Sequence, residues 1–190
     1  MNRLSTFSIV GYDPETNQLG VAVQSKFLAA GAVVPWARAN VGAVATQSAA
    51  NTTYGPRGLK LLQEGHSPEE VVERLVGKDE ESEIRQVGVV DSSGNSTAFT
   101  GDECMDYAGQ ISKDNFTCQG NILVSEETIT AMAEEFLETD EDPLSERLVS
   151  ALAAADQAGG DSRGKQSAAL LVVEEEGGYG GFNDRKIDLR

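Results

Sequence analysis

"TFSIVGYDPETNQLGVAVQS", residues 6–25, is the stretch that decides the fold. β-Branched and aromatic residues alternate over residues 6–12, the intervening "DPETNQ" carries the proline and asparagine typical of turns, and "LGVAVQS" at residues 19–25 returns as the partner strand. The pattern predicts two antiparallel strands joined by a tight turn, almost at the start of the chain. Thr6 opens this buried hairpin and Lys26 follows it, so the function of these two polar residues is the first question that the sequence raises.

The rest of the chain alternates between strand and helix patterns. Small apolar residues at 41–49 predict a strand buried on both faces. Apolar residues at helical spacing predict four helices, at residues 54–65, 67–79, 125–139 and 142–160. Ser67 and Ser125 are the expected N-caps of the second and third of these helices. Further strands are predicted within residues 84–101, 107–112, 116–124, 165–176 and 185–190, and a buried loop or short helix at residues 27–40.

The order of these elements favours one fold class. The helices come in pairs between groups of strands, whereas a doubly wound parallel sheet needs a helix after nearly every strand. An α+β fold with mostly antiparallel sheets is therefore expected. A chain of 190 residues is typical of a single domain, here residues 1–190.

Charge and composition exclude several classes of partner. The chain has 31 acidic and 15 basic residues, a formal net charge of −16. Nucleic acids and anionic membrane surfaces both select for basic proteins, so neither is an expected partner. No apolar run is long enough to span a bilayer and no secretory signal is recognisable, which predicts a cytoplasmic protein. The two cysteines, Cys104 and Cys118, are too few for a disulfide framework.

The sequence also limits the chemistry. The single histidine, His66, lies in the predicted turn between two helices, where a surface position is expected. Zinc-ligand spacings, dinucleotide fingerprints and phosphate-binding loops are absent from the sequence, so we expect no metal and no cofactor. A hydrolase of this sequence would need another base, such as an N-terminal amine or a lysine of lowered pKa.

Several segments carry a family resemblance. They are "TFSIVGYDPETNQLGVAVQSKFLAAGAVVPWARANVGAVATQSAAN", "YGPRGL", "AFTG", "QGNIL" and "GGDSRGKQSAALLVV". From Thr6 to Arg190 the chain resembles the uncharacterised prokaryotic family DUF1028, which is similar in fold to the N-terminal-nucleophile (Ntn) hydrolases. The resemblance implies a four-layer α-β-β-α sandwich with two mostly antiparallel sheets. Relative to that family, residues 1–5 are an N-terminal extension, and the C-terminal end is expected to be truncated.

The resemblance gives the opening hairpin a catalytic interpretation. In Ntn hydrolases the first residue of the first strand is the nucleophile, and its own α-amine is the base. Thr6 occupies that place, and Lys26 would lower its pKa or stabilise an oxyanion. Because "MNRLS" precedes Thr6, its amine is free only after processing or a later translation start. Without either, Thr6 is a β-branched strand residue, and Lys26 is equally compatible with a solvated strand end.

Polar residues near other strand ends are candidate substrate contacts. In "GGDSRGKQS", Asp161 is expected to give electrostatic support and Arg163 to bind a substrate carboxylate, although the same pair would also fix a turn. The remaining candidates for substrate binding are Gln166, Ser167, Gln119, Asn121 and Gln47. Gln119 and Asn121 are alternatively turn caps.

Two functional hypotheses follow from these residues. The first is an Ntn-type hydrolase that cleaves an amide or related C–N bond in a small polar metabolite. The alternative is a non-catalytic protein on the same fold that binds a small anion through Arg163 and the "QGN" segment. A homo-oligomer is expected from the fold family.

Overall fold

The fold is mixed α/β, with four helices and two antiparallel sheets in residues 6–190, the part of the chain that the computed structural model describes. The expected extension, residues 1–5, lies outside the described residues. The strands are β1 (Thr6–Asp13), β2 (Gln18–Ser25), β3 (Pro35–Arg38), β4 (Gly42–Ser48), β5 (Arg85–Asp91), β6 (Ser96–Thr100), β7 (Gly109–Lys113), β8 (Phe116–Asn121), β9 (Ser167–Val173) and β10 (Arg185–Leu189). The helices are α1 (Tyr54–Gln63), α2 (Pro68–Val76), α3 (Glu127–Glu138) and α4 (Leu144–Gln157).

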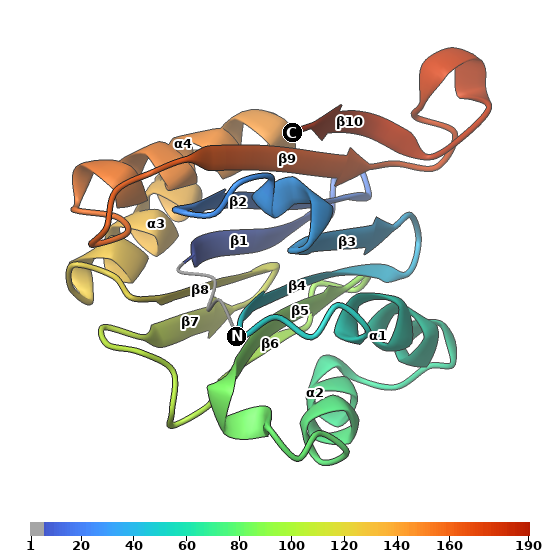
Figure 1. The fold of residues 1–190 in the computed structure, drawn as a ribbon. Coiled ribbons are helices and arrows are strands. Elements are labelled where there is room, and N and C mark those ends of the chain that lie inside the picture. Colours follow the sequence, from blue (N-terminus) through green and yellow to red (C-terminus); the bar gives the residue numbers. More distant parts are fainter. Residues whose placement is uncertain (1–5) are drawn as a thin grey trace.

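The opening hairpin lies in the middle of the larger sheet. That sheet has the strand order β10-β9-β2-β1-β8-β7, and the smaller one has the order β3-β4-β5-β6 (Figure 1). In the hairpin, Thr6 pairs with Ser25 at the open end and Asp13 pairs with Gln18 at the turn. The predicted hairpin is confirmed, and β8 and β9 flank it on its two sides.

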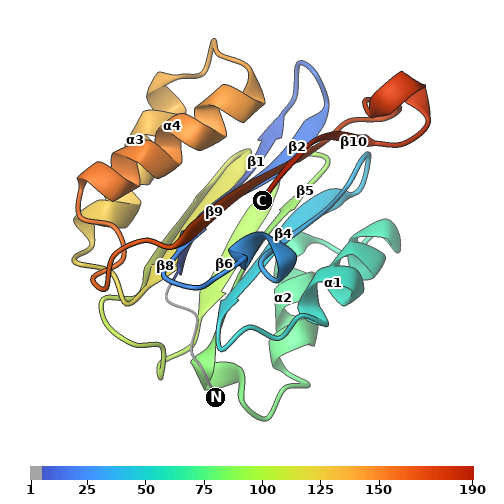
Figure 2. The ribbon, with the colours of Figure 1, turned by 45° about the horizontal axis from the view of Figure 1, so that its top comes forward.

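The helices cover one face of each sheet, and the other faces meet each other (Figure 2). Alternation along β1 explains this: Phe7 and Ile9 point to α3 and α4, whereas Val10 packs with residues of the smaller sheet such as Ala43 and Val90. On the far face of the smaller sheet, Val44, Val87 and Val89 pack with side chains of α1 and α2, which include Leu59, Val71 and Leu75.

Local sequence signals explain most element boundaries. The predicted N-cap of α2 is confirmed and forms part of a capping box: Ser67 Oγ accepts the Glu70 N–H, and the Glu70 carboxylate accepts the Ser67 N–H. The prediction that Ser125 caps the next helix is wrong. The N-cap of α3 is Glu126, whose side chain makes no cap bond. The Ser125 carbonyl instead accepts the N–H of Thr128, the second residue of the helix.

The segment at residues 27–40 differs from its prediction. It contains the short 3₁₀ helix η1 (Ala30–Ala32) but also a strand, β3, at the edge of the smaller sheet. Proline is tolerated at the start of an edge strand, and Pro35 occupies that position. Trp36 lies directly against α1, where a Cβ on Gly55 would come 2.2 Å from the indole ring.

None of the helices within residues 6–190 combines the length and the apolar character that crossing a bilayer requires.

Candidate functional site

The space between the two sheets changes from apolar to polar toward the end where β1 begins. Its centre holds apolar side chains such as Val10, Val21 and Ala45. Around Thr6 the same space holds Ser8, Gln47, Gln86, Gln119 and Asn121, all with no exposed surface. Burying so many polar groups is costly unless they bond to one another.

These buried side chains, which we call the amide network, form a connected set of hydrogen bonds. Ser8 Oγ donates to Gln47 Oε1 at 2.7 Å, and Gln47 Nε2 donates to Gln86 Oε1 at 2.8 Å. Gln119 Nε2 reaches Ser8 Oγ at 2.6 Å, and Asn121 Nδ2 reaches Gln86 Oε1 at 3.0 Å. The network joins strands of both sheets and contains no charged side chain.

A glycine makes room for this network. Gly88 lies on β5 and faces Gln119, and a Cβ there would come 2.2 Å from Gln119 Oε1. Any side chain at position 88 would therefore displace the buried amide. The smaller sheet approaches the larger one closely at this point because residue 88 has no side chain.

Thr6 lies at the edge of the amide network. Its hydroxyl is 3.1 Å from Ser25 Oγ, and its carbonyl accepts long hydrogen bonds from Gln47 Nε2 at 3.4 Å and Asn121 Nδ2 at 3.5 Å. Thr6 and Ser25 are both fully buried. The head of β1 is thus held through its side chain and through its backbone.

Ser25 is a site residue that the sequence reasoning missed. It ends β2, directly opposite Thr6 in the hairpin register. Opposite residues of an antiparallel pair point to the same face, so the length of the turn alone would have placed the two hydroxyls together.

Asp161 connects the head of the hairpin to the loop after α4. Its Oδ2 accepts the Lys26 backbone N–H at 3.0 Å, and its Oδ1 accepts the Arg163 backbone N–H at 2.9 Å. Arg163 Nε lies 3.5 Å from the same Oδ1. Asp161 is buried, and both of its oxygens fix backbone. The structure therefore shows the turn-fixing arrangement that the sequence left open for Asp161 and Arg163.

The other predicted residues near this loop differ in exposure. The side chains of Lys26 and Gln166 are exposed, and Arg163 retains 42% of its side-chain surface. Ser167 differs, because its hydroxyl donates to the Phe27 carbonyl at 2.7 Å and accepts the Ala30 N–H at 3.0 Å. Ser167 thus holds the segment that follows β2 against β9.

The predicted site residues therefore form two groups that meet at Ser25. The buried group is Thr6, Gln47, Gln119 and Asn121; the outer group is Lys26, Asp161, Arg163, Gln166 and Ser167. The Ser25 hydroxyl contacts Thr6, and the Ser25 carbonyl accepts the Gln166 N–H at 2.9 Å. A cavity of about 260 Å³ lies beside the outer group, lined by Gln24, Lys165, Gln166, Ser167 and Ala168.

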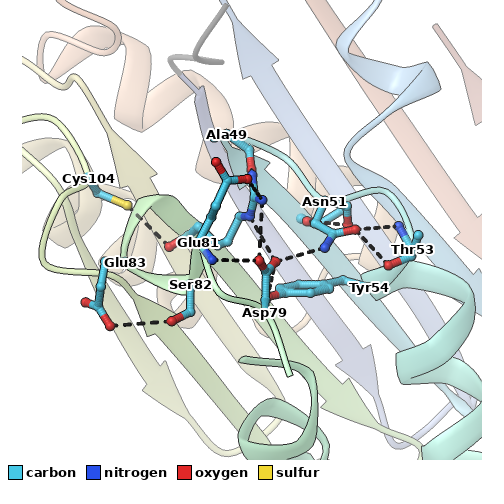
Figure 3. A network of polar contacts seen from close by, with 11 residues as sticks. Ala49, Asn51, Thr53, Tyr54, Asp79, Glu81, Ser82, Glu83 and Cys104 are labelled. Atoms are coloured by element: carbon cyan, nitrogen blue, oxygen red, sulfur yellow. Dashed lines mark hydrogen bonds and ion pairs between the residues drawn. The ribbon is translucent and has the colours of Figure 1, made fainter. Parts of the chain in front are cut away.

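A second polar cluster lies on the opposite face of the smaller sheet (Figure 3). Arg85 is its centre: Nε donates to Asp79 at 3.0 Å, one terminal nitrogen donates to Glu81 at 2.7 Å, and the other donates to the Ala49 carbonyl at 2.6 Å. Asp79 Oδ2 also accepts the Tyr54 hydroxyl at 2.9 Å. We call this set the Arg85 cluster.

The charges of the Arg85 cluster shift the pKa of its members. Burial alone would raise the pKa of Asp79, but hydrogen bonds, led by that from Arg85, outweigh it and hold the pKa well below its usual range. Burial and the hydrogen bond to Asp79 raise the pKa of Tyr54 well above its usual range. All three nitrogens of the Arg85 guanidinium donate to protein acceptors, so this cluster braces the α1–α2 region.

Neither metal ligation nor thiol chemistry is evident in the described residues. Within residues 6–190 no group of three or more His, Cys, Asp or Glu side chains is arranged to hold a metal ion. Cys104 and Cys118 are buried and form no disulfide, and burial raises the pKa of the Cys118 thiol. His66 lies between α1 and α2, with Nδ1 3.4 Å from Glu70 Oε2.

Comparison with known proteins identifies relatives. The solved structure of protein SPO2555 from Silicibacter pomeroyi, itself described as DUF1028, is 36% identical to this chain; the alignment covers 90% of this chain and 74% of that one, with a TM-score of 0.85. A comparison with curated proteins found no match. The sequence matches the family of unknown function DUF1028 over residues 6–190. The chain therefore belongs to the DUF1028 family.

Proposed function

We propose that this protein is a cytoplasmic Ntn-type hydrolase that cleaves an amide or related C–N bond in a small polar metabolite. In this proposal the two facing sheets with their outer helix pairs are the four-layer α-β-β-α sandwich of that class. The observation that carries the proposal is the setting of Thr6. Its hydroxyl heads the central strand of the larger sheet, 3.1 Å from Ser25 Oγ, and its carbonyl is held by Gln47 and Asn121.

The proposed reaction uses the α-amine of Thr6 as its base. The amine takes the proton from Oγ1, directly or through a water, and Oγ1 attacks the carbonyl carbon of the substrate. The tetrahedral intermediate collapses, the C–N bond breaks, and the leaving nitrogen takes the proton from the ammonium. Water then hydrolyses the acyl-threonine ester and regenerates the free hydroxyl. Ser25 keeps Oγ1 oriented toward the amine throughout.

The outer residues would supply charge and substrate contacts. Asp161 fixes the Lys26 backbone, which places the start of the lysine side chain next to the head of β1. There the ammonium group would stabilise the developing oxyanion. Gln166, whose side chain is exposed and whose backbone is anchored, would reach a polar group of the substrate; Arg163 would do so by leaving its 3.5 Å contact with Asp161. Ser167, Gln119 and Gln47 keep the walls of the site in position.

The mechanism requires that the bond before Thr6 be broken. Thr6 is fully buried in the structure, so the proposal also requires that substrate gain access to it after this cleavage. In this proposal, cleavage of the peptide bond before Thr6 both frees the α-amine and gives the substrate access to the hydroxyl. A chain that begins at Thr6 and a chain in which residues 1–5 remain are therefore expected to differ in activity.

The test compares three proteins that differ at one position. A chain with Thr6 directly after the initiator Met would lose that Met, since aminopeptidase accepts a small second residue. This protein, its T6S variant and its T6A variant are treated with a β-lactone, which acylates nucleophilic hydroxyls, and the modified residue is mapped by mass spectrometry. Acylation of residue 6 in the first two and none in T6A supports the proposal. Equal labelling of all three proteins would contradict the proposal.

A second candidate function has its own supporting observation. The cavity of about 260 Å³ has Lys165 and Gln166 in its wall, and Lys26 and Arg163 lie on the neighbouring segments, in a chain of net charge −16. Lys165 pairs with Asp156 and Arg163 pairs with Asp161, so a small carboxylate would bind here by exchanging with these aspartates. Calorimetric titration with succinate separates the two: binding that R163A weakens and T6A leaves unchanged, in a protein without turnover, favours this alternative.

A further inference from the structure

A second cavity lies at the end of the smaller sheet away from Thr6. Its volume is about 540 Å³, within the range of small-molecule sites. Three internal segments of the chain form its wall, within residues 40–41, 62–67 and 91–95. β4 runs from Gly42, which pairs with Asp91 of this wall, to Gln47 of the amide network. These five residues of strand separate the cavity from the candidate nucleophile by about 17 Å.

Two amide side chains in this wall, Gln63 and Asn40, have carbonyl oxygens that are already occupied. Arg38 Nη1 donates to Gln63 Oε1 at 2.7 Å, and Asn17 Nδ2 donates to Asn40 Oδ1 at 2.7 Å. Within residues 6–190, neither Gln63 Nε2 nor Asn40 Nδ2 donates to a protein acceptor. The two amides therefore offer hydrogen-bond donors, rather than acceptors, to a ligand.

His66, the single histidine of the chain, adds an acceptor to the same wall. Its Nδ1 lies 3.4 Å from Glu70 Oε2, and because an ionised carboxylate only accepts, Nδ1 carries the hydrogen. In the neutral imidazole the other ring nitrogen, Nε2, is then an acceptor. The side chain retains 26% of its surface. The wall thus combines amide donors with an imidazole acceptor.

The carboxylate in this wall, that of Asp91, is engaged by its own turn. Its Oδ1 accepts the Ser93 N–H at 2.8 Å and the Asn95 N–H at 2.9 Å, and its Oδ2 accepts Asn95 Nδ2 at 2.8 Å. These three donors offset the charge of Asp91 without removing it. Leu62 adds an apolar surface on which the C–H groups of a ligand can pack.

We propose that this cavity binds a small neutral polyhydroxylated molecule, a monosaccharide or a polyol, independently of the chemistry at Thr6. A hydroxyl group both donates and accepts hydrogen bonds. Neighbouring hydroxyls can therefore accept from the amides of Gln63 and Asn40 and donate to His66 Nε2. The carbon skeleton between the hydroxyls would pack on Leu62.

Charged ligands fit the same wall less well. A carboxylate offers only acceptors, so it would leave the His66 acceptor without a donor, and its charge would be repelled by Asp91. A cation would meet the two amide NH2 groups, which carry the wrong polarity for it. The donors and acceptors of the wall therefore favour a neutral ligand that has both kinds of group.

His66 gives the experiment its readout. Because the chain has one histidine, the Hε1 signal of the ring is identified in the NMR spectrum of tag-free protein without further assignment. The protein is titrated separately with glucose, sorbitol and succinate at constant pH and ionic strength. We expect glucose or sorbitol to shift this signal saturably, with a dissociation constant of about 1–10 mM, and succinate to leave it in place. A signal that neither glucose nor sorbitol moves, or that succinate moves more strongly, would overturn the proposal.

Matched variants assign the binding to this wall. Q63E keeps an acceptor for Arg38 but replaces the NH2 donor by an oxygen, and Q110E makes the same change in charge on the distant strand β7. We expect Q63E to weaken binding about two- to ten-fold, the effect of losing one hydrogen bond, and Q110E to leave it unchanged. N40G removes the other amide and tolerates the left-handed backbone of Asn40, at φ 60°, so it should weaken binding similarly. Wild-type affinity in both Q63E and N40G would contradict the proposal.

Discussion

Arg85 and Gln86 are neighbours in β5, yet they belong to two unlike polar clusters on opposite faces of the same sheet. Arg85 points toward α1 and α2 and is held by two carboxylates and a carbonyl. Gln86 points toward the larger sheet and belongs to the amide network near Thr6. One cluster is charged and lies on the face that carries α1 and α2; the other is neutral and lies between the sheets. The stability contributed by the Arg85 cluster should therefore depend on pH. The amide network, which surrounds Thr6, should contribute the same stability at every pH.

The largest loss of stability is expected from removing Arg85, the centre of the Arg85 cluster. R85M leaves Asp79 buried without its cation, which should lower the free energy of unfolding by about 3–5 kcal/mol. Urea unfolding measures this directly. The matched control is E81Q: the Glu81 side chain is 58% exposed, and its loss should cost less than about 1 kcal/mol. Similar losses in both variants would contradict the central role of the Arg85–Asp79 pair.

A smaller loss is expected in the amide network. Q47L has a similar volume but removes the partner of Ser8 and a donor to Gln86, and each buried group left unpaired costs about 1–3 kcal/mol. Thermal and urea unfolding both report it. Q110L is the control, since Gln110 is an exposed residue of β7 and its amide can bond to water instead. If Q47L were as stable as wild type, the network would be dispensable for folding.

The pH dependence of stability should differ between variants of the Arg85 cluster and variants of the amide network. The pKa of Asp79 is depressed in the folded protein, so its contribution is present above its unfolded pKa of about 3.9 and is lost as the pH falls below that value. The stability difference between wild type and R85M should therefore shrink in acid. The difference between wild type and Q47L should stay constant, because none of its partners titrates. Parallel pH profiles for the two variants would refute this distinction.

The smallest effect is expected from salt. A net charge of −16 destabilises the compact state by self-repulsion, and salt screens it, so stability should rise when KCl is increased from about 20 mM to about 500 mM. The penalty of R85M should change little over this range, because the Arg85–Asp79 pair is buried and weakly screened. A penalty that disappears at the higher salt concentration would place that pair in solvent.

Much of the fold was predictable because its signals are local. Alternation in the opening hairpin and the N-cap signal at Ser67 each depend on residues close in sequence. β3 was missed, because its four residues are too few to show a period. The Arg85 cluster was missed as well: Asp79 and Arg85 lie near each other in sequence, but Ala49 and Tyr54 join them only through tertiary packing.

The candidate site was predictable only in part for the same reason. Gln47, Gln119 and Asn121 were singled out as polar residues near strand ends. No pattern indicates that the Gln47 and Asn121 amides both donate to Gln86, or that Gln47 also donates to the Gln119 backbone carbonyl. Ser25 and Gln86 went unnoticed, although strand pairing places Ser25 beside Thr6 and sheet packing places Gln86 beside Asn121. Contacts between sheets depend on how the sheets pack, which a single sequence does not specify.

One measurement tests the role of Thr6 most directly: the rate at which the protein hydrolyses p-nitroanilides of small polar acids when a single glycine is placed before Thr6. Both proteins keep every side chain, but only the chain that begins at Thr6 has an α-amine beside Oγ1. We expect the added glycine to lower the rate by about 10²–10⁴-fold, the range that general-base catalysis contributes. Equal rates would contradict the account, because the hydroxyl would then be activated by some other base.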